Sequence, residues 1–161
     1  MKSVLLIGGC GSGKTWVMKN LIKSLKLTQK GKAGLFKFVT DGKLAVLGNY
    51  DGSMFEGSDK LSMAVMSDCV KFEKVREANN LFVVCEGDRF TNKTFINTCK
   101  PHIIRIMDDG EKGRKFRNSK QSERQIKSIR TRVMNTKANV EVSGSQEALD
   151  YLKDLLCKEL S

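Results

Sequence analysis

The sequence lacks several features that would point to particular classes of protein. Its 161 residues include one proline and one histidine, and no apolar run approaches the roughly 20 residues that a membrane-spanning helix needs. We therefore expect no membrane partner. The apolar run at 4–7 stops at a glycine loop, so it predicts a strand rather than a secretory signal. The lone His102 has no histidine partner for a metal site and is expected to be structural.

The spacing of the cysteines also gives no sign of a disulfide framework or a zinc site. The five cysteines are scattered, and no two have the spacing of metal ligands. Their odd number, and the position of three of them in apolar stretches, are typical of reduced, buried thiols in a cytoplasmic protein. The length fits a single domain spanning 1–161.

Positive charge, in contrast, is abundant and localised. The chain has 29 basic and 18 acidic residues, a formal net charge of +11. Residues 112–137 contain ten basic residues and one acid, Glu123, so this segment carries +9 and the rest of the chain only +2. Such a segment is typical of contact with a polyanion, although charged stretches are also commonly just solvated faces.

Strand and helix patterns alternate along the chain. Buried strands are predicted at 4–7, 44–47, 81–85, 102–107 and 140–142, and an edge strand at 35–39. Helices are predicted after the glycine loop to about 25, and at 60–78, 91–98, 122–135 and 146–158, with Ser122 and Gln125 as a capping box. This alternation predicts an α/β fold, with a mostly parallel sheet covered by helices on both faces. Ligands of such folds bind at the carboxyl ends of the strands.

The most specific motif follows the first strand. Residues 8–15 read GGCGSGKT, which fits the P-loop pattern G-x-x-x-x-G-K-[ST]. The glycines let backbone N–H groups turn toward one point, Lys14 brings a positive charge to the β- and γ-phosphates, and Thr15 offers a hydroxyl to Mg²⁺. A glycine-rich turn without a ligand is the alternative. We predict a P-loop nucleoside-triphosphate hydrolase/kinase fold that binds ATP and Mg²⁺. Its predicted nucleotide-binding residues are Gly8, Gly9, Cys10, Gly11, Ser12, Gly13, Lys14, Thr15 and Trp16.

Acidic side chains follow the strand at 81–85. In P-loop proteins an acid in this place supports Mg²⁺, so Glu86 and Asp88 join Thr15 as predicted metal-site residues, with solvated loop acids as the competing interpretation. The adjacent Arg89 is expected either to pair with one of these acids or to hold a substrate phosphate.

The segment GNYDGSMFEGSD at 48–59 is too long to be a mere connector. A kinase that acts on a hydroxyl needs a carboxylate within hydrogen-bond reach of it, and Asp51 and Asp59 are the candidates. Tyr50 and Phe55 are candidate aromatics for stacking on a base. The competing interpretation is that these aspartates serve turn formation only.

The basic segment at 110–137 lies between the last two predicted strands, where P-loop kinases carry a mobile lid. Lid arginines close over the phosphates and stabilise charge on the transferred group. We predict Arg114 and Arg124 as catalytic, while Arg117 and Arg130 are further candidates. A kinase of small metabolites needs only two or three such residues, so the surplus favours a polyanionic substrate.

Taken together, GGCGSGKT, LGNYDGSMFEGSDKLS, VVCEGDRF and RNSKQSERQIKSIRTRV resemble motifs of the bacteriophage 5-hydroxymethyluracil DNA kinases, P-loop kinases of DNA hypermodification. The resemblance covers nearly the whole chain. Its first motif is generic, while G-S-D-K-L-S and the basic segment are more specific. It implies transfer of the ATP γ-phosphate to the hydroxymethyl oxygen of a modified thymine in DNA, which activates that position for later base modification. It also implies P-loop roles for Lys14 and Thr15, the acidic position at Glu86, and a location in the host cytoplasm.

Three functions stay open at this point. The first is this DNA kinase, with DNA containing a hydroxymethylated pyrimidine as its partner, and the second is a kinase of free nucleotides or nucleosides. The third is a DNA-binding P-loop ATPase without a phosphoryl acceptor. The sequence assigns neither the catalytic base nor the oligomeric state. The adenine pocket is expected near 135–145.

Overall fold

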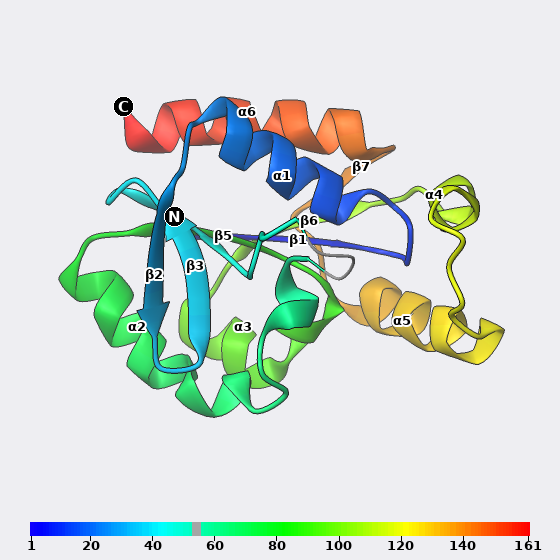
Figure 1. The fold of residues 1–161 in the computed structure, drawn as a ribbon, viewed down its shortest axis with the longest axis horizontal. Coiled ribbons are helices and arrows are strands. Elements are labelled where there is room, and N and C mark those ends of the chain that lie inside the picture. The colour runs from blue at the N-terminus through cyan, green and yellow to red at the C-terminus, as the bar shows by residue number, and fades with distance from the viewer. Residues whose placement is uncertain (53–55) are drawn as a thin grey trace.

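A seven-stranded sheet, mostly parallel, forms the centre of the computed structural model, which describes residues 1–52 and 56–161 (Figure 1). The strand order is β2-β3-β4-β5-β1-β6-β7. The parallel strands are β4 (Leu44–Leu47), β5 (Phe82–Glu86), β1 (Ser3–Gly8), β6 (His102–Ile106) and β7 (Val140–Val142), whereas β2 (Gln29–Ala33) and β3 (Phe36–Thr40) are antiparallel additions at one edge. The predicted α/β class with a mostly parallel sheet is confirmed.

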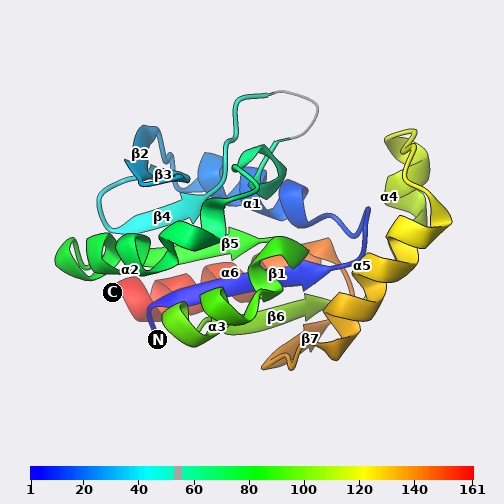
Figure 2. The ribbon, with the colours of Figure 1, turned by 90° about the horizontal axis from the view of Figure 1, so that it is seen from below.

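Helices cover both faces of the sheet (Figure 2). One face carries α1 (Lys14–Ser24) and α6 (Ser145–Leu160), and the other carries α2 (Cys69–Ala78), α3 (Lys93–Cys99) and α5 (Glu123–Asn135). Strand β1 lies between β5 and β6 and is buried along its whole length, because helices cover it on both sides. This explains its continuous apolar run. None of the described helices is both long and apolar enough to cross a membrane.

Local signals placed several elements correctly. The capping box of α5 is present, with the Gln125 amide donating to Ser122 Oγ at 3.2 Å and the Ser122 amide donating to Gln125 Oε1 at 3.0 Å. A further short helix, α4 (Glu111–Phe116), precedes it within the basic segment 110–137. The sequence patterns did not predict α4.

The helix predicted at 60–78 is wrong in its first half. The chain forms two short 3₁₀ turns, η1 (Ser58–Lys60) and η2 (Val65–Asp68), before α2 begins at Cys69. Tertiary hydrogen bonds explain the difference, because Arg89 Nη1 donates to the Leu61 carbonyl at 2.6 Å and the Leu35 amide donates to Asp68 Oδ2 at 2.7 Å. Both bonds favour the turns over a continuous helix.

The edge strand is also misplaced by the sequence patterns. Strand β3 was predicted to lie at the edge, but β2 pairs with it and covers it. Gly31 lies within β2, and the ring of Phe38 packs over it in the space that a Cβ atom at this position would occupy. Packing thus accounts for a glycine inside a strand.

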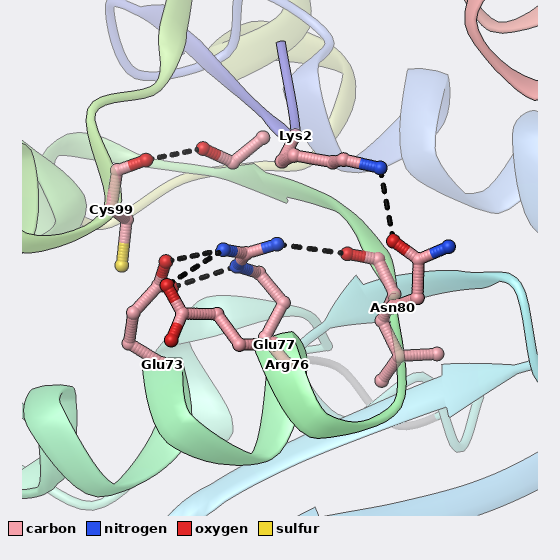
Figure 3. A network of polar contacts seen from close by, with 8 residues as sticks. Lys2, Glu73, Arg76, Glu77, Asn80 and Cys99 are labelled. Carbon is pink, nitrogen blue, oxygen red and sulfur yellow. Dashed lines mark hydrogen bonds and ion pairs between the residues drawn. The ribbon is translucent and has the colours of Figure 1, made fainter.

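A polar network fastens α2 and α3 to the amino ends of β1 and β5, opposite the glycine loop (Figure 3). Arg76 is buried and donates to both Glu73 carboxylate oxygens at 2.6 and 2.9 Å. Ser3 Oγ donates to the Cys99 carbonyl at 2.8 Å, and Lys2 Nζ donates to Asn80 Oδ1 at 3.0 Å. These contacts are structural and leave the carboxyl edge of the sheet available for a site.

The remaining single-residue expectations concern the thiols and the imidazole. Four cysteines are buried and all five are free, but Cys157 is exposed, which the expectation of buried thiols missed. His102 Nε2 lies 3.0 Å from Tyr151 Oη on α6. This contact agrees with the structural role predicted for His102.

Candidate functional site

The glycine loop joins the end of β1 to the start of α1. Gly11 and Gly13 have φ values of 81° and 92°, which favour glycine, and Gly13 is the N-cap of α1. A side chain at Gly13 would lie 2.7 Å from Ser145 Cβ at the start of α6. No side chain caps the amino end of α1, so its first amides and the helix dipole favour an anion there.

Lys14 folds back over this loop. Its Nζ donates to the carbonyl oxygens of Gly8 and Gly9, each at 2.9 Å, and lies 3.5 Å from Ser12 Oγ. Within residues 1–52 and 56–161, Lys14 forms no salt bridge. The direct contacts of this positive charge are therefore with backbone carbonyls and a hydroxyl, all within the loop.

Thr15 and Glu86 meet at the carboxyl ends of β1 and β5. Thr15 Oγ1 donates to Glu86 Oε1 at 3.2 Å, and Glu86 is only 3% exposed. The pKa of Glu86 is raised, chiefly by burial and further by the negative charge of Asp59. The positive charge of Lys14 and hydrogen bonds from Thr15 and the Ser58 backbone act in the opposite direction and lower it. This buried carboxyl group has partners for its charged form and a cation close by.

The pair fits the chemistry of magnesium. Mg²⁺ commonly takes one or two protein oxygens and fills its other positions with waters and substrate phosphates. Thr15 and Glu86 supply a hydroxyl and a carboxylate next to the glycine loop. The described residues contain no group of three or more His, Cys, Asp or Glu side chains that would make a metal cage.

Asp88 and Arg89 have other partners. The Asp88 carboxylate lies 2.7 Å from Arg132 Nη2, so it ties η3 (Asp88–Thr91) to α5 and makes no hydrogen bond to Thr15. Arg89 holds the turn at 61–63 and pairs with neither Glu86 nor Asp88. Of the two acids predicted for the metal site, the structure brings only Glu86 to Thr15.

Tyr50 and Gly57, from the segment 48–59, pack against Glu86. Asn49 and Gly57 exchange two backbone hydrogen bonds, at 3.0 and 2.8 Å. Gly57 has a φ of 85°, and a Cβ atom there would overlap Glu86 Oε1. Burial and the Glu86 carboxylate, including a hydrogen bond to it, raise the pKa of Tyr50. Tyr50 therefore lies beside Glu86, while Phe55, the other predicted stacking residue, lies outside the described residues.

The two candidate bases differ in their surroundings. Both Asp51 and Asp59 are exposed. Asn49 Nδ2 donates to Asp51 Oδ2 at 3.1 Å, whereas Asp59, in η1, is close enough for its charge to raise the pKa of Glu86. The charge of Asp59 therefore acts on the carboxyl group of the Thr15–Glu86 pair.

The start of α4 packs directly on the glycine loop. Arg114 Nη1 donates to the carbonyls of Cys10 and Asp109, both at 2.7 Å. Cβ atoms at Gly110 and Gly113 would overlap the carbonyl oxygens of Cys10 and Gly11, respectively. Sequence reasoning missed these two glycines; their spacing of three residues, which places them on one helix face, was the available signal.

The other predicted residues lie further from these contacts. Arg124, in the first turn of α5, is exposed and makes no hydrogen bond or ion pair within the described chain. Trp16 is 44% exposed in the first turn of α1. A groove of about 800 Å³ separates α4 from α5, and Arg114, Lys127 and Arg130 are among the residues that line it.

The glycine contact yields a first prediction. Gly113→Ala should displace α4 from the glycine loop and lower the ATP-dependent activity that the sequence predicts by about 10²-fold, because small misplacements of catalytic groups are costly. Alanine is the better helix former, so a loss would not reflect a weaker helix. Steady-state kinetics would measure it, with Lys112→Ala as the control on the same helix. Full activity of Gly113→Ala would show that α4 need not contact the loop.

Taken together, the site offers a cation, a hydroxyl and a buried carboxylate at the carboxyl edge of a parallel sheet, where ligands of such folds bind. A second cation, Arg114, is docked on the same loop. The groups are those that bind a phosphate chain with a divalent cation. In comparisons with known proteins, no protein-family model and no curated protein matches the chain.

Proposed function

We propose that this protein is an ATP-dependent kinase with a P-loop fold that phosphorylates the hydroxymethyl hydroxyl of 5-hydroxymethyluracil in DNA, as a step in base hypermodification. The observation that carries the proposal is the meeting of Lys14, Thr15 and Glu86 at one edge of the sheet. The resemblance of the motifs to phage DNA kinases supports the choice of acceptor.

In this scheme, ATP binds in the glycine loop. The loop amides and the start of α1 hold the phosphates, and Lys14 exchanges the carbonyls of Gly8 and Gly9 for phosphate oxygens. Thr15 and Glu86 would hold Mg²⁺, which supplies charge neutralisation between the β- and γ-phosphates. Binding of a cation also compensates the buried charge of Glu86. Arg114, held by the Cys10 carbonyl, is placed to stabilise charge on the transferred group.

The acceptor hydroxyl enters from the side of the loop at 48–59. Asp59 takes the hydroxyl proton while the hydroxymethyl oxygen forms a bond to the γ-phosphorus. The bond from that phosphorus to the bridging oxygen breaks, and ADP leaves with the electron pair. The basic segment 110–137 acts as a lid and contacts the DNA backbone.

The two aspartates give a second prediction. Asp59→Asn should lower kcat by about 10²-fold or more, because it removes the proton acceptor without changing the size of the side chain. Asp51→Asn is the matched control and should retain most of the activity. Initial rates at saturating ATP would measure both. Inactivation by Asp51→Asn together with normal turnover of Asp59→Asn would reverse the assignment.

The proposed function is tested with γ-labelled ATP, magnesium and three acceptors: DNA containing 5-hydroxymethyluracil, the same DNA with thymine, and the free hydroxymethylated nucleotide. Label in the first acceptor only is the expected result. Label in the free nucleotide but not in DNA would make the protein a nucleotide kinase. Release of inorganic phosphate stimulated by DNA, with no labelled acceptor, would make it an ATPase.

A further inference from the structure

We propose that the β2–β3 hairpin is a second DNA-binding surface, whose lysines Lys30, Lys32 and Lys37 hold the phosphodiester backbone of the acceptor strand. This surface lies apart from the basic segment 110–137. The proposal rests on the proposed function only for the identity of the acceptor. Its evidence is charge, register and a groove in the hairpin itself.

The hairpin brings together lysines from two neighbouring strands. Residues 26–43 contain five lysines and one acid, Asp41, a local net charge of +4. Lys32 lies directly opposite Lys37 in the antiparallel ladder, and Lys30 lies opposite Val39. Because side chains alternate between faces, the three lysines share one face of the hairpin.

This charge is not compensated by neighbouring acids. Like charges directly opposite each other weaken a strand pair, yet no acidic group lies within 4.0 Å of these three lysines in the part of the chain that the structure describes. The Asp41 carboxylate instead accepts hydrogen bonds from the Lys43 and Leu44 amides, at 2.9 and 2.8 Å. Lys32 and Lys37 thus face each other in the β2–β3 hairpin without a neighbouring acid among the described residues. This arrangement indicates that an anion from outside the chain binds there.

A groove of about 220 Å³ lies beside the lysines. Its walls are formed by residues 30–32 and 37–39 of the hairpin and by Gly48, Asn49 and Tyr50. Tyr50 in turn lies beside Glu86, which accepts from Thr15. One wall residue of the groove, Tyr50, therefore also lies beside the candidate site.

The position of the hairpin selects a polymer over a small anion. The Gly48 amide donates to the Lys37 carbonyl at 2.8 Å, so Lys37 lies at the carboxyl end of β4, on the edge of the sheet that carries the site. In both views the hairpin lies on one side of the described part of the 48–59 loop, and α4 and α5 lie on the other (Figures 1 and 2). A strand that enters over the hairpin and leaves along the basic segment contacts both surfaces, which a single nucleotide is too short to do.

The test replaces Lys30, Lys32 and Lys37 together with glutamine. The control replaces Lys100, Lys153 and Lys158 with glutamine, which removes the same charge from α6 and the end of α3. Binding of a fluorescent single-stranded oligonucleotide containing 5-hydroxymethyluracil would be measured by anisotropy at several salt concentrations. Three lost phosphate contacts should reduce the slope of log K against log salt by about 2 and raise the Kd by about 10-fold or more near 0.1 M salt.

Further readouts separate this proposal from its alternatives. ATP binding and the melting temperature should not fall in the hairpin variant, because Lys14 is untouched and a like-charge pair is removed. A salt slope equal to that of the control variant would overturn the hairpin proposal, even if the protein phosphorylates DNA. Loss of binding to anionic lipid vesicles, with DNA binding unchanged, would also overturn it and assign the hairpin to a membrane surface. If the hairpin variant binds DNA more weakly than the parent but the parent transfers no phosphate, the hairpin is a DNA-binding surface and the proposed kinase function is wrong.

Discussion

Replacing Lys14 with alanine is expected to lower phosphoryl transfer by about 10³-fold while the protein stays folded. In the structure Lys14 contacts only the loop itself, at the Gly8 and Gly9 carbonyls and near Ser12. These contacts are local: they join the start of α1 to the end of β1 and to the loop between them, and the two ends are only six positions apart in the chain. The substitution therefore removes the charge that we propose binds the phosphate chain, and loss of one preorganised electrostatic contact typically costs 10²–10³-fold in rate.

The measurement is transfer from labelled ATP, together with a thermal melt of each variant. Lys23→Ala is the matched control, since Lys23 also lies on α1 but at its carboxyl end, away from the loop. We expect Lys23→Ala to retain normal transfer and both variants to melt within a few degrees of the parent protein. An active Lys14→Ala variant would exclude the glycine loop as the phosphate site.

Glu86→Gln is expected to combine a large loss of activity with unchanged or increased stability at neutral pH. Activity should fall by about 10²-fold or more, because the variant lacks the carboxylate that we propose supports Mg²⁺ beside Thr15. Stability should not fall, because burial raises the pKa of Glu86 above the ordinary 4.5 and the charged form is therefore disfavoured in the folded state. Glutamine keeps the shape and an oxygen for the Thr15 hydroxyl without that charge.

The pH dependence follows from the direction of this shift. Above pH 4.5 the unfolded chain loses the Glu86 proton before the folded protein does, so the folded state binds more protons and this contribution lowers stability as pH rises. Thermal unfolding of both proteins from pH 4 to pH 8 would measure it. The stability of Glu86→Gln relative to the parent should increase with pH over this range. A relative stability that decreases with pH would mean that the charged form of Glu86 is favoured by folding.

These two substitutions separate binding of the phosphate chain from support of the cation. Lys14→Ala should weaken nucleotide binding even without magnesium, whereas Glu86→Gln should mainly reduce the effect of magnesium. Titration of ATP binding with and without Mg²⁺ would distinguish the two roles. Equal losses under both conditions for Glu86→Gln would argue that Glu86 positions Thr15 instead of supporting the cation.

Tertiary contacts decided the features that the sequence analysis missed. The spacing of apolar residues favoured a helix from 60, but contacts with Arg89 and Leu35 keep residues 58–68 in two short turns. The acids near the site were likewise sorted only by the fold. Asp88 follows the same strand as Glu86, yet it turns to Arg132 on α5, more than 40 positions away in the chain.

The sequence by itself determined the alternating α/β architecture, the glycine loop with Lys14 and Thr15, the acid at Glu86 and the capped helix of the basic segment. All of these are written in residues that are neighbours in the chain or repeat with the period of a strand or helix. Tertiary structure alone decided that Gly57 covers Glu86, that Gly110 and Gly113 seat α4 on the loop, and that Lys32 faces Lys37. Close packing and strand register decide these contacts, and a local pattern such as the three-residue spacing of Gly110 and Gly113 does not identify the residues they meet.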